Sequence, residues 1–482
     1  MSEIESPVAL PEPAPPPAAR AGMLDLTQGT VGKTLFRFSL PTLGSNVLQS
    51  LNGSISAIYV GKFLGESAFA AAGISNMVIF LIFSTVFGLA MAATIMVGQA
   101  MGRGDELEVR RTIGATAGAF AIASVVLGFV GWFIIEPMLY LLATPEAAFA
   151  PAVAFLKVVF ATLPVVFIMI LLQSALRGVG DAVTPLWSTV INVGLSLVLN
   201  PVLILGFGPV PALGLPGAAL AGALANLICL VFMVWRIYRL DLPIRLNRDE
   251  LYLLKPDWGH LKPILTIGVP MSLSMVVMSL SSLVMIGLVN REGVETVAAY
   301  NAATQLWNYI QMPAFAVSSA VSAMAAQNIG AGRWDRIGQL ARVGAGANVA
   351  MTTVLIGVLV VAGPLLLGLF LPLGSPAIDI GQHINLLIGW TFIPMGVSMV
   401  MTSIVRANGA VIAPFVILFV SVIVVRMSVG FGFYPMYRAD AIWWAFIASS
   451  TSSALLSVLY YLKGNWRAPK RSLHGAAPDP AM

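Results

Sequence analysis

The chain has 482 residues, of which 58% are hydrophobic and only 10% are charged. A soluble domain carries about 25% charged residues, so this composition excludes an ordinary soluble protein and indicates a chain that lies in a lipid bilayer. The formal net charge of +5 reflects membrane topology, as argued below, and nucleic acid is not expected as a partner.

Long apolar runs follow one another along the chain. About 20 apolar residues are enough to cross the hydrocarbon core, so we expect an all-α membrane protein. The Pro-rich residues 1–22 predict a disordered tail, and residues 463–482 a basic one. Between them the sequence predicts twelve transmembrane helices over residues 33–61, 68–98, 112–141, 147–176, 183–207, 215–238, 260–290, 296–327, 338–371, 377–405, 412–434 and 440–462.

Lys and Arg are unevenly distributed between alternate connections. If the N-terminus is placed in the cytoplasm, the inner loops and ends carry most of these residues, and the outer loops carry only Lys62, Arg291 and Arg438. Loops rich in Lys and Arg stay on the cytoplasmic side. The sequence therefore predicts a multi-pass protein of a bacterial inner membrane with both termini in the cytoplasm.

The first half of the chain recurs in the second half. The segment VGQAMGRGDELEVRR at 97–111 returns as AAQNIGAGRWDRIGQ at 325–339, and LRGVGDAVTP at 176–185 returns as VRANGAVIAP at 405–414. A constant offset across separate landmarks predicts a parallel internal repeat. We expect two six-helix lobes, an N-lobe over 23–238 and a C-lobe over 260–462, joined by a cytoplasmic linker over 239–259.

Groups for catalysis and metal binding are scarce in this sequence. His260, His383 and His474 are too scattered for a metal site, and no phosphate loop or spaced pair of carboxylates is present. An active site gathers titratable groups in a cleft. We therefore expect no enzyme activity, no metal and no cofactor, and transport is the favoured function.

At these landmarks the chain resembles the multidrug and toxic compound extrusion (MATE) family, of the NorM/DinF-like kind. VGQAMGRGD is similar to that family's loop after helix two, LRGVGDAVTP to its helix four–five connection, and LPTLGSNVLQSLNGSISAIYVGKFLG to its first helix. The resemblance covers about residues 30–465. It implies two lobes in a V shape, alternating access, and export of amphipathic, often cationic, small molecules driven by entry of H⁺ or Na⁺.

The chain departs from this family at the coupling residues. Many members carry an Asp in helix one, where Ser56 stands here, and some carry another in helix five, where Asn200 stands. The sodium-coupled branch uses carboxylates in helices seven and ten, and those spans hold none that is central here. The coupling ion is therefore left open by the sequence.

Polar side chains form stripes along three of the predicted helices. A lipid-facing amide is costly, so these stripes should face inward. They line a central cavity for substrate or cation in one interpretation, and hold helices together within a lobe in the other. The candidate residues are Asn46, Gln49, Gly53 and Ser56 in the first span, Thr189, Asn192, Ser196 and Asn200 in the fifth, and Asn301, Gln305, Asn308 and Met312 in the eighth.

Arg426 lies deep inside the eleventh predicted span. A guanidinium at this depth needs an acceptor or water. We expect it to line the C-lobe cavity or to hold a carboxylate such as Asp379, and the alternatives are a structural ion pair or a side chain that reaches the outer surface. Such a cation would repel a cationic substrate.

Two further groups are candidates for ion coupling. Glu136 and Lys157 lie on neighbouring spans and can pair across the outer hairpin, so Glu136 is either a coupling group or a structural partner. His383, near the outer end of span ten, titrates in a useful range or is simply packed or water-facing. The inner turns predict hinges or gates at Gln99, Gly102, Arg177, Asp181, Gln327, Gly330 and Arg406, in which Asp181 pairs with Arg177 or caps the fifth span.

Three classes of function compete for this sequence. Ion-driven export of small amphipathic molecules is favoured. A flippase for a lipid-linked precursor would need several central cations, and only Arg426 and Lys157 qualify. A membrane enzyme or channel is disfavoured by the missing carboxylates and by the duplicated, Pro-containing helices. The expected partners are the lipid bilayer and an amphipathic small molecule, and the chain is expected to be monomeric.

Overall fold

The computed structural model describes residues 22–207, 211–372 and 374–468. Every regular element in these ranges is helical. The elements are α1 (Val31–Gly102), α2 (Glu106–Leu141), α3 (Glu146–Val179), α4 (Val183–Leu205), α5 (Leu215–Arg239), η1 (Arg248–Leu254), α6 (Trp258–Val289), η2 (Asn290–Glu292), α7 (Val294–Gly330), α8 (Trp334–Leu367), α9 (Pro376–Ile388), η3 (Gly389–Thr391), α10 (Phe392–Ala407), α11 (Ile412–Phe419), the π-helix η4 (Val420–Val425), α12 (Arg426–Tyr437), α13 (Ala439–Lys463) and η5 (Asn465–Arg467). The predicted tail over 1–22 falls almost wholly outside the described residues, as do residues 469–482 of the basic tail.

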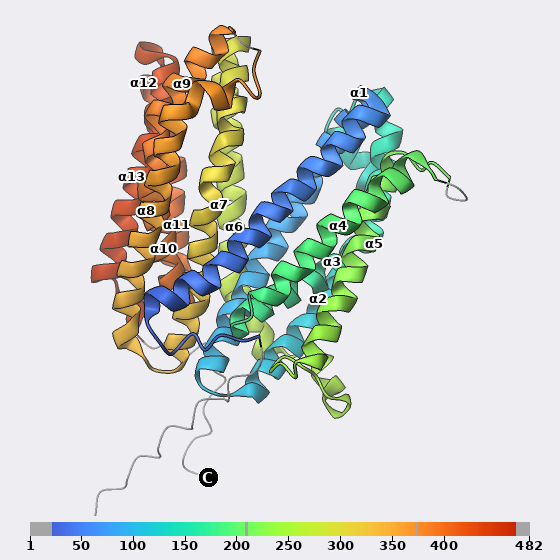
Figure 1. Cartoon of the computed structure of the whole chain (residues 1–482), viewed down its shortest axis with the longest axis vertical. Helices are drawn as coiled ribbons and strands as arrows, with labels where there is room; N and C mark the ends of the chain where they lie inside the picture. Colours follow the sequence, from blue (N-terminus) through green and yellow to red (C-terminus); the bar gives the residue numbers. More distant parts are fainter. Residues whose placement is uncertain (1–21, 208–210, 373, 469–482) are drawn as a thin grey trace, which may run out of the picture.

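The helices gather in two groups that meet at one end and diverge toward the other (Figure 1). We call α1–α5 the N-terminal group and α6–α13 the C-terminal group. The closed end is the end at which α1 finishes at Gly102 and α7 finishes at Gly330, and the opposite end is the diverging end. α1 packs against both α6 and α7, so the groups are joined mainly through these three helices.

The first two predicted spans form the single long element α1, which bends sharply at Gly65. The backbone of Gly65 has a φ of 82° and a ψ of −176°, a conformation that residues with a Cβ avoid. The first arm of α1 therefore runs toward the diverging end, and the second arm, from Ser67, returns to the closed end. The 72 residues of α1 are thus two helical arms joined at Gly65.

Ten of the described helical segments are long and apolar enough to cross a membrane. Ten of the twelve predicted spans correspond to these segments, and the exceptions are residues 33–61 and 296–327. Both of these ranges are helical, but they carry several Asn and Gln side chains. The structure thus has a helix in each of the twelve predicted ranges, and ten of these helices are long and apolar enough to cross a membrane.

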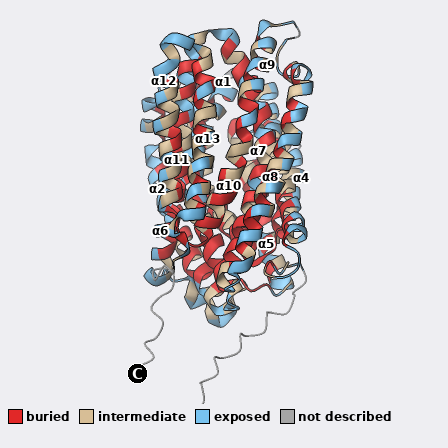
Figure 2. Ribbon diagram, turned by 90° about the vertical axis from the view of Figure 1, so that its left-hand side faces the viewer, coloured by how far each residue is buried: buried red, intermediate tan, exposed pale blue. Residues whose placement is uncertain are grey.

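Burial follows the expected pattern of a membrane bundle. Large apolar side chains such as Phe129, Leu141 and Val361 are exposed on the outside, and Figure 2 shows buried residues concentrated on the inner sides of the helices and toward the closed end. The predicted linker over 239–259 contains η1, which packs on α2 through an ion pair between Arg110 and Glu250 of 3.0 Å.

Candidate functional site

The two groups are fastened at the closed end by a pair of matching hydrogen bonds. The side-chain amide of Gln99, on α1, donates to the carbonyl of Ala407 in the C-terminal group, with an N–O distance of 2.6 Å. The amide of Gln327, on α7, donates to the carbonyl of Gly178 in the N-terminal group at 2.8 Å. Both glutamines are buried. Each therefore binds the opposite group at an equivalent place in the repeat.

Two glycines allow the helix ends to approach closely beside these bonds. A Cβ built on Gly102 would lie 2.0 Å from the carbonyl oxygen of Gln327, and one on Gly330 would lie 2.1 Å from that of Gln99. Real Cβ atoms do not approach so closely. The recurring G in each motif is thus explained by backbone contact between α1 and α7, at positions predicted as a hinge or gate.

The segment before α1 crosses the closed end and touches both groups. The backbone N–H of Leu24 donates to Gly180 of the N-terminal group at 3.1 Å. The side chains of Asn328 and Arg333, in the C-terminal group, donate to the carbonyls of Leu26 and Thr27 at 3.0 and 2.8 Å. This contact was not predicted from the sequence, because the backbone acceptors carry no signal in the sequence.

The remaining predicted hinge residues lie beside the same contact. Asp181 is fully buried and accepts hydrogen bonds from the backbone N–H groups of Val183 and Thr184, both at 2.9 Å. It therefore caps the start of α4, and this burial raises the pKa of its carboxyl. Arg177 donates to Ser174 at 3.4 Å, and Arg406 is partly buried at the end of α10.

The polar stripe of the N-terminal group is held by a chain of amides. The Nδ2 of Asn52 donates to Asn192, and the Nδ2 of Asn192 donates to Asn226, both at 2.9 Å. These bonds join α1, α4 and α5. Asn200 donates to the hydroxyl of Ser56 at 3.4 Å. Asn52 and Asn226 were missed by the sequence analysis, although each is an isolated amide within an apolar run.

Of the other stripe residues, Thr189 donates to the carbonyl of Pro185 in its own helix at 3.0 Å, and the rest make no hydrogen bond within the described parts of the chain. Gln49 is exposed and Asn46 partly exposed on the first arm of α1, and Ser196 is buried on α4. The α7 stripe lies on the face opposite the buried core of that helix: Asn301, Gln305 and Asn308 are exposed and Met312 is partly buried. The exposed residues of α1 and α7 are free to contact a solute. Asn52, Asn192 and Asn226 instead bond to one another, although the Oδ1 atoms of Asn52 and Asn200 are buried without a hydrogen-bond partner among the described residues.

Arg426 is placed among hydroxyl and aromatic groups. Its Nε donates to Ser449 at 2.9 Å and one terminal nitrogen donates to Ser281 at 3.4 Å. Its guanidinium carbon lies 4.6 Å from the ring centre of Phe446. The suggested pairing with Asp379 is wrong, because the acceptors on α6 and α13 are closer partners than that residue near the start of α9.

The candidate coupling groups are paired near the diverging end. Lys157 lies 3.7 Å from the carboxylate of Glu136, which confirms that these residues pair across the hairpin. The side chain of Glu136 is 58% exposed, so this pair is a surface contact. His383 lies 3.0 Å from Asp440, a partner on α13 that the sequence analysis did not identify.

Comparison with known proteins assigns the family. A sequence model described as MatE matches residues 41–202 and again residues 270–431. The two matches cover well over half of the chain, and the second begins and ends 229 residues after the first. The chain is a MATE family transporter.

Curated relatives and solved structures agree with this family. The chain is 31% identical over 434 residues to the "Probable multidrug resistance protein YoeA" of Bacillus subtilis, covering 90% of this chain and 94% of the relative. It is 30% identical over 447 residues to "Probable multidrug resistance protein YpnP" of the same organism, covering 92% and 98%. A structure titled "Outward-facing conformation of a multidrug resistance MATE family transporter of the MOP superfamily" superposes with a TM-score of 0.83 at 18% identity, over 92% of this chain and 97% of the other, which shows the shared fold.

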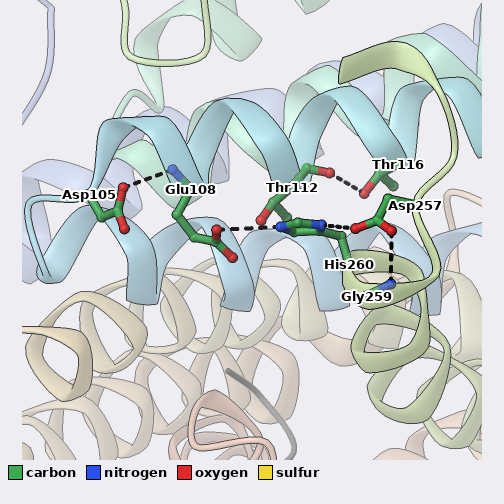
Figure 3. A network of polar contacts seen from close by, with 7 residues as sticks. All are labelled: Asp105, Glu108, Thr112, Thr116, Asp257, Gly259 and His260. Carbon is green, nitrogen blue, oxygen red and sulfur yellow. Dashed lines mark hydrogen bonds and ion pairs between the residues drawn. The ribbon is translucent and has the colours of Figure 1, made fainter. Parts of the chain in front are cut away.

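This MATE transporter has a further contact between its groups at the closed end, centred on His260 (Figure 3). His260, on α6, has its Nδ1 2.6 Å from Asp257 and its Nε2 3.4 Å from Glu108 on α2. Asp105 accepts the backbone N–H of Glu108 at 2.9 Å and so fixes the start of α2. The hydrogen bond from His260 holds the pKa of Asp257 below its ordinary value.

Proposed function

We propose that this protein is a secondary active exporter of amphipathic small molecules, driven by the entry of H⁺ or Na⁺. Its helices form two six-helix lobes, related by a parallel repeat and together spanning the membrane twelve times. The lobes are residues 23–238 and 260–462, and residues 239–259 connect them. Substrate reaches opposite sides of the membrane as the lobes rock against each other.

The observation that carries this proposal is the symmetric closure by Gln99 and Gln327. The two bonds are equivalent under the repeat, and each crosses from one lobe to the other. Separation of the lobes at this end breaks these two bonds together with the glycine contacts and the apolar packing beside them. Alternating access by rocking of two repeats requires this kind of breakable closure.

The charge distribution supports a cytoplasmic position for the closed end. Its helix ends and turns carry Arg103, Arg110, Arg111, Arg333 and Arg336, and cytoplasmic connections are enriched in such residues. With this orientation the lobes diverge toward the outside. The conformation would then be the one that releases substrate and accepts the coupling ion from outside.

The position of the charges favours export of a small molecule over flipping of a lipid-linked precursor. A pyrophosphate would need several central cations. Lys157 is engaged by Glu136 and partly exposed, which leaves Arg426 as the central cation of the described residues. The names of the relatives, which describe multidrug resistance proteins, support the same choice.

The test is transport by the purified full-length chain in proteoliposomes. Ethidium, a cation, and dansylate, an anion, are loaded separately, and their movement is followed under an imposed proton gradient, under an imposed sodium gradient, and with neither. The proposal predicts that at least one of the two dyes moves and that its movement depends on one of the two gradients. Equal movement without any gradient would indicate a channel, and no movement of either dye under either gradient, in correctly inserted protein, would contradict export.

A further inference from the structure

We propose that the C-terminal group contains a binding site for an amphipathic organic anion, in which the guanidinium of Arg426 receives the acidic group. This inference rests on the proposed export function and specifies its substrate. It replaces the cationic substrate that the family resemblance implies with one that carries a carboxylate, sulfonate or phosphate.

The first step is the position of the charge. Arg426 follows the start of α11, at Ile412, by 14 residues, which places it about 21 Å along the helix and near the middle of the span Ile412–Tyr437. An ionised side chain at this depth is costly and marks a functional site unless a partner neutralises it. Such a partner would ordinarily be a carboxylate.

The second step is the absence of that carboxylate. Within the part of the chain that the structure describes, the hydrogen-bond acceptors of Arg426 are two serine hydroxyls and no acid. The acidic residues of the C-terminal group, among them Glu292, Asp379 and Asp440, lie at helix ends. The positive charge therefore has no counter-charge among the described residues.

The third step is that the two serines hold the guanidinium in a fixed orientation. The hydroxyl of Ser449 donates to the carbonyl of Phe446 at 3.0 Å, and that of Ser281 donates to the carbonyl of Val422 at 3.3 Å. Both hydroxyl protons are thus used elsewhere, so each oxygen presents a lone pair to Arg426. Both serines are at most 1% exposed, which makes them a rigid support.

The local helix geometry contributes to this placement. The turn before Arg426, η4, is a π-helix over Val420–Val425. Such turns are rare and occur frequently at functional sites. The carbonyl of Val422, which accepts from Ser281, lies within this turn. The wider turn and the serine support therefore set the direction of Arg426 together.

The fourth step concerns what a ligand would meet. An arginine has five N–H donors in a planar fork, and two of them are used by the serines. The residue is only partly buried, and its other donors have no acceptor among the described residues. One face of the guanidinium lies over Phe446, which borders a cluster formed with Trp307, Tyr300 and Trp443.

These features define the ligand by its chemistry. The free fork suits an acidic group with two oxygens, because Arg binds carboxylate, sulfonate and phosphate oxygens in pairs. The partly exposed ring of Phe446, which the buried aromatic cluster supports from behind, suits an apolar or aromatic body. A cation would meet Arg426 at close range without a compensating acid, and would be repelled.

The test compares two probes that differ mainly in charge, dansylate (a sulfonate) and dansylamide (its neutral sulfonamide). Binding to the full-length, detergent-solubilised protein is measured by equilibrium dialysis. We expect dansylate to bind at least about tenfold more tightly, as a charged hydrogen-bonded pair would give. Arg426→Gln should abolish this preference and leave the affinity for dansylamide unchanged, and Arg426→Lys should keep part of it.

Controls separate the site from charge and folding effects. Arg342→Gln removes an exposed arginine of α8 and should keep the preference of the wild-type protein. If Arg426→Gln fails to fold, Ser281→Ala and Ser449→Ala provide the same test, because misaligning the guanidinium should reduce the preference several-fold. Absence of a preference in the wild-type protein, or its persistence in Arg426→Gln, would overturn the inference. If inorganic phosphate displaced dansylate as effectively as an organic anion does, the site would not need an organic ligand, and that part of the inference would be overturned.

The failure of this inference and the failure of the proposed export are distinguishable. Gradient-driven movement of ethidium, together with no Arg426-dependent binding of dansylate, would leave the exporter standing and remove the anion site. Arg426-dependent binding of dansylate, with no gradient-driven movement of either probe, would leave the anion site standing and contradict export.

Discussion

The side chains of Ser56 and Asn200 meet in the structure, with the amide nitrogen of Asn200 3.4 Å from the hydroxyl of Ser56. These are the two positions at which the family resemblance expects acidic residues. They come from α1 and α4, and the contact joins them with neutral side chains. A single substitution can therefore place a carboxylate at a site prepared by the fold.

Asn200→Asp is expected to make transport more dependent on pH than it is in the wild-type protein. Asn200 is only 2% exposed, and burial disfavours the charged form of a carboxyl, so the new group should take up a proton readily. The measurement is the transport rate as a function of outside pH. Asn200→Ala serves as the control, since it removes the amide without adding an acid, and an identical pH profile in the two variants would contradict the expectation.

Gln99→Ala and Gln327→Ala should each weaken the closed end by a similar amount. Each removes a buried side-chain bond to a backbone carbonyl of the other group, which corresponds to about 1–3 kcal/mol. The distance between spin labels at residues 111 and 335, in a Cys229→Ala background, reports the opening. Because the bonds are equivalent in the repeat, the double variant should open further than either single one; a large effect of one glutamine and none of the other would be inconsistent with symmetric closure.

Gly102→Ala and Gly330→Ala should prevent full closure. The added methyl groups would overlap the carbonyl oxygens of Gln327 and Gln99, and the resulting strain should be about 1–3 kcal/mol. The same pair of spin labels should show a larger open population and transport should slow. Gly338→Ala, where a Cβ meets nothing within 4 Å, is the matched control and should behave like the wild type.

Asn192→Ala should lower the stability of the protein, whereas Asn46→Ala should alter transport without changing stability. Asn192 bonds to both Asn52 and Asn226, and bonds of this kind within membranes contribute about 0.6 kcal/mol each, with a maximum near 2. Its loss should lower the thermal stability. Asn46 makes no such bond, so its replacement should leave stability unchanged while altering transport. A change of stability in both variants would show that the first arm of α1 is also structural.

His260→Gln should remove a pH dependence of the closed end. A neutral imidazole has one N–H, so both carboxylates are hydrogen-bonded only by the protonated ring. The pKa of Asp257 is lowered, so its carboxylate stabilises the contact at every pH above its ordinary pKa. That stabilisation is lost only in acid, and Asp257 therefore stays ionised near neutrality. The hydrogen bond to Glu108 raises the pKa of His260 above its ordinary value. The contact with Glu108 is therefore fully present below the ordinary histidine pKa of about 6.5 and weakens as the pH rises through the raised pKa.

This expectation is checked with the closed-end spin labels between about pH 6 and pH 9, on either side of the histidine titration. The wild-type protein should open more at the higher pH, and His260→Gln should respond less. Arg103 and Arg111 also face Glu108, but they keep their charge in this range. An equal response of the two proteins would rule out His260 as the titrating group.

The features that could be predicted from the sequence are those that recur or alternate along it. The apolar runs predicted a helix in each of the twelve ranges, and the offset between Gln99 and Gln327 singled out the residues that fasten the groups. The pairing of Glu136 with Lys157 followed from their positions on adjacent helices. These relationships are local or repeated, so a single sequence contains them.

Contacts between distant elements could not be predicted in the same way. Asn52 and Asn226 were overlooked because an isolated amide does not reveal its partner on another helix. The contact of His260 with Glu108 depends on the packing of α6 against α2. For Arg426 the sequence left several alternatives open, a carboxylate among them, and did not identify the serines of α6 and α13, which carry no charge pattern. Three-dimensional packing, absent from the sequence pattern, decided each case.

The measurement that tests alternating access most directly compares two distances in proteoliposomes under an imposed ion gradient. One pair of spin labels, at residues 111 and 335, reports the closed end, and a second pair, at 141 and 294, reports the diverging end. The account predicts that the gradient and substrate change the two distances in opposite directions, one lengthening as the other shortens. Transport with a closed-end distance that never lengthens under any condition would contradict it.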